Sequence, residues 1–308
     1  MINVLFAGHP SRWPIYEAPL RDAFDRAGLD VDLRTDCAPE LVDYIIYAPD
    51  SPLQDFTTYT RCKAVLNLWA GVEAIVGNET LTQPLARMVD YGLKQGMTEW
   101  VVGHVLRHHL DIDFFLQRQS GVWDPKVPPL SRDRKITVLG LGELGAAAAQ
   151  ALATLGFDVT GWSRSAKDIA GIRCLHGDDL KVALQGAQIV VLLLPDTPAT
   201  LNILNANTLS LLAPGAAILN PGRGSLIDDD ALLAALDSGQ IGHATLDVFR
   251  VEPLPAAHPF WAHRRVTVTP HIASETRPET ASEVIAENIR QGEADEPLLH
   301  VVDRQLGY

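Results

Sequence analysis

The segment ITVLGLGELG, residues 136–145, joins an apolar run to an alanine-rich stretch through three glycines. Residues 136–139 are typical of a buried strand, and residues 144–155 have the composition of a helix. In the pattern G-x-G-x-x-G, the first glycine permits a tight turn, the second lets a pyrophosphate approach the backbone, and the third lets the helix pack closely on the strand. The first N–H groups of the helix then face the anion. We therefore expect a dinucleotide to bind at Gly140, Gly142, Glu143, Leu144 and Gly145.

Strand-like runs alternate with helical stretches on both sides of this segment, which predicts parallel α/β layers. The expected strands are residues 2–7, 31–33, 44–47, 64–68, 136–139, 159–162, 189–194, 217–220, 244–248 and 266–269. The expected helices are residues 16–27, 98–116 with Thr98 as the cap, 144–155 and 275–290. We predict two Rossmann-like, doubly wound parallel-sheet domains with the active site in the cleft between them. Residues 1–99 plus 272–308 would form the substrate-binding domain, and residues 100–271 the dinucleotide-binding domain.

Composition excludes several functional classes. The chain of 308 residues has 25 Lys+Arg against 38 Asp+Glu, a formal net charge of −13, which argues against binding nucleic acid or anionic membranes. No apolar run approaches the roughly 20 residues that span a bilayer, and the first residues resemble a strand rather than a signal peptide. The cysteines at 37, 62 and 174 lack any paired spacing, so we expect a reducing, cytoplasmic location.

The end of the second expected strand of the nucleotide domain favours a phosphorylated cofactor. An NAD site carries an acidic residue about 20 residues beyond the glycines, where it accepts from the ribose 2′-hydroxyl. Here Ser163 takes that position and Arg164 and Ser165 follow it. A small hydroxyl and a guanidinium suit a 2′-phosphate, which a carboxylate would repel. We expect NADP(H) to be preferred over NAD(H), with NAD(H) still usable.

Polar side chains follow three later strands of the same predicted sheet. Arg223 comes after residues 217–220, Asp247 and Glu252 after the next strand, and His271 after the last. Open α/β sheets bind ligands at the carboxyl ends of their strands, so we expect these groups to gather at one edge.

These motifs, in this order, resemble the D-isomer-specific 2-hydroxyacid dehydrogenase family. The resemblance covers nearly the whole chain and rests on residues 194–200, 220–224, 247–253 and 270–271. Within the family, the short chain and residues 68–72 and 162–165 are most similar to the glyoxylate/hydroxypyruvate reductase A group. One departure is Gly222, where the family often has alanine.

The resemblance implies roles for these residues. Arg223 would bind the substrate carboxylate and polarise its keto oxygen, while His271 would donate the proton and Glu252 would pair with it. Asp247 would hold the nicotinamide end of the cofactor. Elementary chemistry agrees, because reduction of a 2-oxo acid leaves an alkoxide that needs a proton near neutral pH, and a carboxylate favours the imidazolium form. The remaining expected contacts are Leu194 and Pro195 to the cofactor, and the backbone amides of Ala70, Gly71 and Val72 to the substrate carboxylate.

The expected reaction is NADPH-dependent reduction of small 2-oxo acids, glyoxylate and hydroxypyruvate foremost, to D-2-hydroxy acids. Two alternatives stay open: an NAD-dependent dehydrogenase of other substrate preference, and a non-catalytic, corepressor-like protein that senses nucleotide. His104 and His108 lie four residues apart on a predicted helix, but no third ligand is near in sequence, so we expect no metal. The family resemblance also implies a homodimer formed through that helix.

Overall fold

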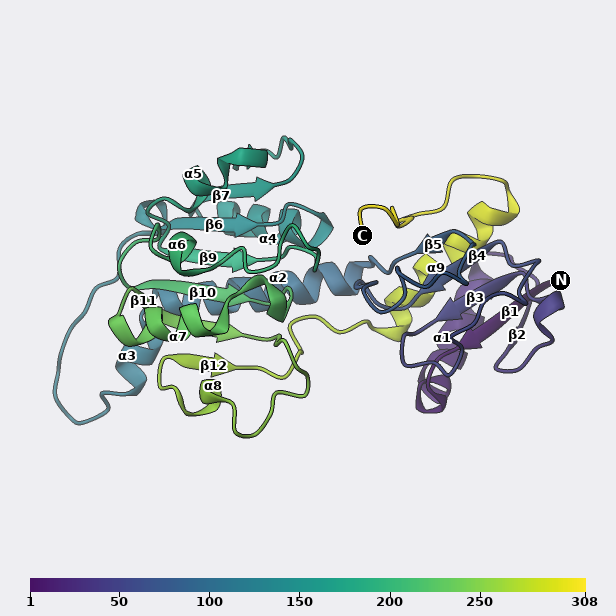
Figure 1. The fold of residues 1–308 in the computed structure, drawn as a ribbon, viewed down its shortest axis with the longest axis horizontal. Helices are drawn as coiled ribbons and strands as arrows, with labels where there is room; N and C mark the ends of the chain where they lie inside the picture. Colours follow the sequence, from purple (N-terminus) through teal and green to yellow (C-terminus); the bar gives the residue numbers. More distant parts are fainter. The chain divides into compact units, whose positions relative to one another are not determined.

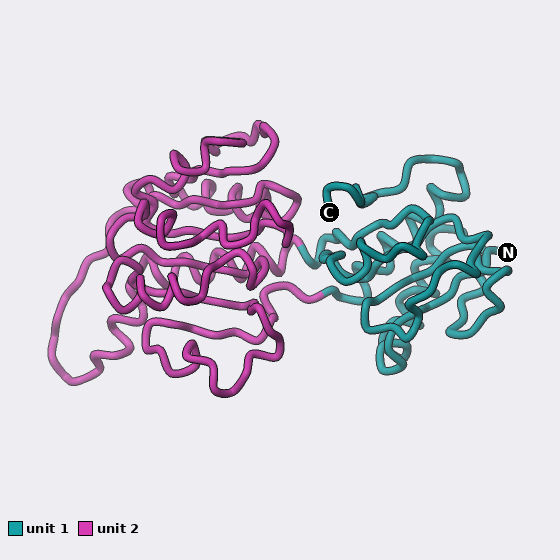
Figure 2. The backbone as a smooth tube through the Cα atoms, in the orientation of Figure 1, with its two compact units in different colours: residues 1–93, 276–308 teal, residues 94–275 magenta.

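The computed structural model describes residues 1–308, which form two compact units (Figure 2). Unit 1 comprises residues 1–93 and 276–308, and unit 2 comprises residues 94–275. The first boundary lies six residues before the one expected (93 against 99), and the second lies four residues after it (275 against 271). None of the helices combines the length and apolar character needed to cross a membrane.

Unit 1 is built on a five-stranded parallel sheet in the order β2-β1-β3-β4-β5 (Figure 1). Its strands are β1 (Ile2–Ala7), β2 (Val31–Arg34), β3 (Tyr44–Tyr47), β4 (Ala64–Asn67) and β5 (Leu85–Ala86). In register, Val4 of β1 lies opposite Leu33 of β2 on one side and Tyr44 of β3 on the other. Because the strands are parallel, the segments that follow β1, β3 and β4 leave the sheet at the same edge.

Two helices of unit 1 pack against each other (Figure 1). They are α1 (Trp13–Arg26) and α9 (Pro278–Glu293), and the unit also contains the 3₁₀ turns η1 (Pro10–Arg12) and η2 (Pro39–Leu41). Helix α1 begins with Pro14 in its first turn, where the missing N–H costs nothing, and buries Tyr16, Leu20, Ala23 and Phe24 at helical spacing. The C-terminal helix thereby completes the core that the first residues begin.

Unit 2 holds a seven-stranded parallel sheet in the order β12-β11-β10-β9-β6-β7-β8. Its strands are β6 (Lys135–Leu139), β7 (Asp158–Ser163), β8 (Arg173–His176), β9 (Ile189–Leu192), β10 (Ala216–Asn220), β11 (Ile241–Leu246) and β12 (Val266–Val268). The chain runs outward from β6 to β8 and then restarts on the other side at β9. The order therefore reverses between β6 and β9, which is the switch point where such sheets bind ligands.

Helices cover both faces of this sheet. They are α2 (Tyr91–His109), α3 (Ile112–Leu116), α4 (Glu143–Thr154), α5 (Leu180–Leu184), α6 (Ala206–Leu209), α7 (Asp229–Ser238) and α8 (Pro259–Ala262), with 3₁₀ turns η3 (Ser131–Asp133), η4 (Gly177–Asp179) and η5 (Gly224–Leu226). Figure 1 shows α6 and α7 on the near face, with α2 and α4 on the far face.

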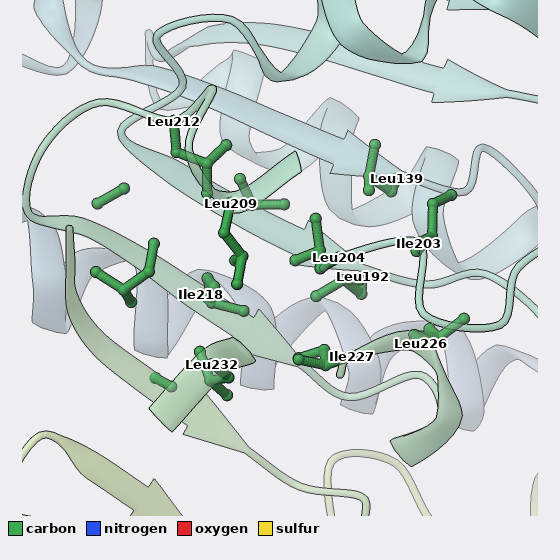
Figure 3. Close-up of a cluster of buried hydrophobic side chains, with 14 of the residues drawn as sticks. Leu139, Leu192, Ile203, Leu204, Leu209, Leu212, Ile218, Leu226, Ile227 and Leu232 are labelled. Carbon is green, nitrogen blue, oxygen red and sulfur yellow. The ribbon is translucent and has the colours of Figure 1, made fainter. Parts of the chain in front are cut away.

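Alternate residues of each strand enter two separate cores, as the pleat requires. In β9, Val190 and Leu192 join the cluster under α6 and α7, where Figure 3 shows Leu204 next to Leu192 and also labels Leu209 and Leu232. Ile189 and Val191 of the same strand join the opposite cluster, with α2 and α4. Two-sided burial explains why this strand is apolar throughout.

Several expected boundaries were wrong. The helix expected at 98–116 begins at Tyr91, and the backbone N–H of Leu93 donates to Asp90 Oδ1 at 2.6 Å, so Asp90 rather than Thr98 caps it. Thr98 lies inside the helix and donates to the carbonyl of Lys94. The helix stops at His109 because Asp111 adopts a positive φ of 54°, and α3 follows as a separate turn. Strands β5 and β8 were not expected, and β9 ends two residues earlier than predicted, at Leu192.

Candidate active site

The three motif glycines of unit 2 serve three different purposes. Gly140 follows β6 with φ +103°, and a Cβ there would lie 2.4 Å from the carbonyl oxygen of Leu193. A Cβ on Gly145 would lie 1.8 Å from the carbonyl oxygen of Gly140, so only glycine allows α4 to start so close to the strand. Gly142 instead meets no atom within 4 Å, which leaves its backbone open to a ligand. This geometry fits a pyrophosphate at the N-terminus of α4, beside Glu143 and Leu144.

The segment after β9 adjoins the glycine loop across the switch point. A Cβ on Gly140 would also lie 2.9 Å from the backbone nitrogen of Leu194. Leu194 is buried, and the carbonyl of Pro195 accepts a hydrogen bond from Thr200 Oγ1 at 2.7 Å. The backbone at Leu193 and Leu194 therefore lies against the glycine motif, and Pro195 follows it directly in the chain.

Strand β7 ends at Ser163, the first of the three residues expected to contact the ribose of the cofactor. Ser163 is buried, and its hydroxyl donates to the carbonyl of Ser165 at 2.8 Å, which shapes the turn. Arg164 and Ser165 are exposed at the end of the strand. The position carries no carboxylate that would repel a 2′-phosphate.

The loop that carries Arg223 is braced by Asn220, the buried last residue of β10. Asn220 Nδ2 donates to the carbonyl of Arg223 at 2.9 Å, and Asn220 Oδ1 accepts from the backbone N–H of Gly222 at 3.2 Å. A Cβ on Gly222 would lie 2.8 Å from the carbonyl oxygen of Leu192, so glycine lets this loop approach the end of β9 closely. Nothing in the sequence alone assigned this bracing role to Asn220.

Two of these loops meet at Gly224. A Cβ on Gly224 would lie 2.0 Å from the carbonyl carbon of Phe249, in the loop that follows β11. The Arg223 loop and the loop that leads to Glu252 are therefore in backbone contact. This is the packing that gathers the candidate residues at the carboxyl edge of the sheet.

Asp247 organises the loop that follows β12. Its carboxylate is fully buried, and Oδ1 accepts from the hydroxyl of Thr269 at 2.5 Å and from the backbone N–H of Ile272 at 3.0 Å. Oδ2 accepts from the backbone N–H of Ala273 at 2.9 Å, and the carbonyl of Asp247 accepts from the N–H of His271 at 2.8 Å. Asp247 thus holds the backbone on both sides of His271.

His271 and Glu252 form a close pair. Nδ1 of His271 lies 2.7 Å from Oε2 of Glu252, and Oε1 of Glu252 accepts from the backbone N–H of Phe249 at 2.8 Å. The His271 backbone takes a φ of +54°, a left-handed conformation that is unfavourable for a non-glycine residue. The side chain of His271 as a whole is 54% exposed.

In unit 1, the loop after β4 presents successive backbone N–H groups. Asn67 is buried and its Nδ2 donates to the carbonyls of Trp69 at 2.8 Å and Gly71 at 3.0 Å. The carbonyls are thereby turned toward Asn67, and the amides of Ala70, Gly71 and Val72 donate to no acceptor in the chain. A run of N–H groups of this kind is a site for a carboxylate oxygen. Asn67 had no recognisable signal in the sequence.

His104 and His108 of α2 contact other side chains of unit 2. His108 Nε2 lies 3.0 Å from Thr245 Oγ1 of β11, and its ring lies 5.0 Å from that of His243. Burial lowers the pKa of His108 to about 3 and that of His243 to about 4. The ring of His104 contacts that of Trp100 one turn away, with centroids 4.4 Å apart and the planes tilted by 54°. These rings pack the helix onto the sheet.

Comparison with known proteins agrees with this geometry. Residues 102–273 match the family model described as D-isomer specific 2-hydroxyacid dehydrogenase, NAD binding domain. A glyoxylate/hydroxypyruvate reductase A of Serratia proteamaculans is 45% identical over 257 residues, 80% of this chain and 82% of that protein.

Two solved structures are similar over the full length. A D-isomer specific 2-hydroxyacid dehydrogenase of Xanthobacter autotrophicus Py2, in complex with NADPH and MES, has a TM-score of 0.92 and 42% identity over 100% of this chain and 99% of that one. An NADPH-dependent glyoxylate/hydroxypyruvate reductase of Sinorhizobium meliloti, in complex with NADP and sulfate, has a TM-score of 0.87 and 32% identity over the same shares. With its glycine motif, its histidine–glutamate pair and these relatives, the chain belongs to the D-isomer specific 2-hydroxyacid dehydrogenase family.

Proposed function

We propose that this chain reduces small 2-oxo acids, glyoxylate and hydroxypyruvate foremost, to D-2-hydroxy acids with NADPH. The pair formed by His271 and Glu252 carries this proposal, because it lies beside the Arg223 loop at the ligand-binding edge of a dinucleotide-type sheet. The names of the similar proteins from Serratia and Sinorhizobium support the same substrates and cofactor.

NADPH, when bound, supplies the hydride. The open backbone at Gly142 and the N-terminus of α4 suit its pyrophosphate, and Arg164 suits its 2′-phosphate. We also propose, as the family resemblance implies, that Asp247 holds the nicotinamide end of the cofactor, because the three donors that it accepts from leave its carboxylate with acceptor capacity.

The protein groups act on the substrate in three ways. Arg223 presents a fork of donors to the carboxylate and the keto oxygen, where negative charge grows during reduction. The amides of Ala70, Gly71 and Val72 bind the other carboxylate oxygen. His271 gives its Nε2 proton to the developing alkoxide, while Glu252 holds Nδ1 and stabilises the charged ring before transfer.

The direct test is steady-state oxidation of NADPH in the presence of glyoxylate, hydroxypyruvate, pyruvate and longer 2-oxo acids, with kcat/KM as the readout. We expect turnover with the first two. Binding of NADPH without turnover of any 2-oxo acid would instead favour a nucleotide-sensing protein.

We also propose that the active protein is a cytoplasmic homodimer that binds neither nucleic acid nor membranes. Its three cysteines are unpaired, which suits a reducing compartment. Large apolar side chains are exposed after α2, at Leu116, Val122, Trp123, Val127 and Leu130, and Trp123 is 94% exposed. A second copy of the chain would cover them. Sedimentation equilibrium of the wild type and of Trp123→Ser tests this: the wild type should be dimeric and the variant should dissociate more readily.

A further inference from the structure

An arginine of unit 1 lies against the loop assigned to the substrate carboxylate. The Arg12 guanidinium carbon is 5.4 Å from the centre of the Trp69 ring, and Trp69 directly precedes the loop residues Ala70 and Gly71. Arg12 leaves the sheet after β1 and Trp69 after β4, so both lie at the carboxyl edge of the same parallel sheet. This is the edge at which such sheets bind ligands.

Asp50, which follows β3 at the same edge, fixes Arg12 in place. Nε of Arg12 donates to Oδ2 of Asp50 at 2.7 Å, and Oδ1 of Asp50 accepts from the backbone N–H of His9 at 3.2 Å. The two charged side chains are only 27% and 31% exposed. The side chain of Arg12 is therefore held by an ion pair and an aromatic face.

The terminal amino groups of Arg12, Nη1 and Nη2, donate no hydrogen bond to other groups of the chain. Its only hydrogen bond to the protein is made by Nε, so the Nη donors remain available next to Trp69. The carboxylate of Asp50 keeps lone pairs beyond those that accept from Arg12 and His9. The pair thus offers both a donor and an acceptor at one place, with its opposite charges balanced.

We propose that Arg12 and Asp50 form a subsite for a hydroxyl group on C3 of the 2-oxo acid, and so determine specificity for 3-hydroxy-2-oxo acids such as hydroxypyruvate. This rests on the function proposed above. A hydroxyl both accepts, here from Arg12, and donates, here to Asp50. Glyoxylate has no C3 and pyruvate carries a methyl group there, so neither uses the pair. A second carboxylate at this place would meet Asp50 and be repelled.

The location suits the size of the substrate. In hydroxypyruvate only the keto carbon separates the carboxylate from the carbon that bears the hydroxyl. Correspondingly, Trp69, which Arg12 covers, is adjacent in sequence to the N–H groups that bind the carboxylate. One small molecule can therefore engage both features of the same sheet edge.

The test is calorimetric binding of hydroxypyruvate and of glyoxylate to the enzyme saturated with NADP⁺, where no hydride is available. The proteins are wild type, Arg12→Ala, Arg12→Lys and Asp50→Asn. Arg26→Ala is the control, because Arg26 pairs with Glu283 on the exposed surface of the same unit. In Arg12→Ala the preference for hydroxypyruvate over glyoxylate should fall about 10- to 100-fold, the range for a lost charged hydrogen bond.

The other variants refine the expectation. Arg12→Lys keeps the charge but loses the planar fork, so it should lose part of the preference, and Asp50→Asn should also lose part. Glyoxylate affinity should stay unchanged throughout. If Arg12→Ala and Arg12→Lys each lose the same amount of affinity for hydroxypyruvate and for glyoxylate, Arg12 only supports the Trp69 loop. This result would overturn the proposal. So would an unchanged preference. Failure of the proposed function has a different signature, since wild type would then bind these ligands without oxidising NADPH.

Discussion

Oε2 of Glu252 lies 2.7 Å from Nδ1 of His271, while Oε1 of the same carboxylate accepts from the backbone N–H of Phe249. Glu252 is thus fixed to the main chain through one oxygen and orients the imidazole through the other. With Nδ1 engaged, the proton to be transferred is on Nε2.

Glu252→Gln should lower kcat by roughly 10- to 100-fold. General acid catalysis typically contributes ~10²–10⁴-fold to the rate, and this variant weakens the acid without removing it. The amide has one oxygen and one NH₂ group, so it can accept from Phe249 or from His271 but not from both. Steady-state kinetics with NADPH and glyoxylate check this, and the dissociation constant of NADPH should stay the same. A variant with wild-type kcat would show that the pair is not needed.

Asp247→Asn should lower both the melting temperature and kcat. The buried carboxylate accepts from Thr269, Ile272 and Ala273, and an amide nitrogen would face one of these donors. An unsatisfied buried donor costs about 1–3 kcal/mol, and the displaced loop carries His271. Thermal unfolding and kinetics of this variant should be compared with those of Asp237→Asn, whose carboxylate is exposed on α7. If the two variants behave alike, Asp247 does not position the loop.

Sequence patterns predicted this candidate site because its residues directly follow predicted strands. The carboxyl ends of parallel strands lie at one edge of the sheet, so residues that follow them are expected to gather there. Gly140 and Gly145 were predictable from turn and packing requirements, and both lie too close to backbone atoms for a side chain. The approach of a pyrophosphate to Gly142 stays a prediction. The supporting residues were not predictable in the same way. Asn67 and Asn220 act by donating to carbonyls in adjacent loops, and an asparagine in a sequence does not show which carbonyl it will meet.

The errors in the fold have local causes. Gly92 and Gly96 weaken the helical pattern at the start of α2, which moved the expected cap to Thr98. Its end was placed too late because apolar residues continue beyond His109, although the backbone turns at Asp111. Strand β8, Arg173–His176, mixes polar and apolar residues at the sheet edge, so it lacks the apolar run that identified the central strands.

Arg164→Ala should raise KM for NADPH by about 10- to 100-fold, the value of a charged hydrogen bond to the 2′-phosphate, and leave KM for NADH nearly unchanged. Ser163→Asp should shift the preference further toward NADH, because a carboxylate repels the phosphate and accepts from a 2′-hydroxyl. Lys167 is exposed close by, so Arg164→Ala combined with Lys167→Ala shows whether the two share the phosphate. Equal wild-type kcat/KM for NADPH and NADH would contradict this reading of the β7 end.

Stability should decrease in mild acid because of His108 and His243. Burial lowers their pKa values to about 3 and about 4, below the ordinary value of 6.5, so between pH 6.5 and 4 the unfolded chain binds protons that the folded chain does not. The contribution of the two neutral histidines to the free energy of unfolding is therefore complete above pH 6.5. It is lost as the pH falls, by at most about 1.4 kcal/mol per histidine per pH unit.

Urea unfolding at pH 7.5, 6.0 and 5.0 measures this slope. The double variant His108→Gln with His243→Gln should show a shallower loss of unfolding free energy toward acid than wild type. His176→Gln controls for removing a histidine, because His176 is exposed at the end of β8. A double variant as acid-sensitive as wild type would assign the effect to other groups.

The most direct measurement is kcat of His271→Ala for NADPH-dependent reduction of glyoxylate and hydroxypyruvate. We predict a loss of ~10²–10⁴-fold, the usual cost of removing a general acid, with the dissociation constant of NADPH unchanged because the glycine loop is untouched. A His271→Ala enzyme whose kcat stays within tenfold of wild type would contradict the assignment of His271 as the proton donor.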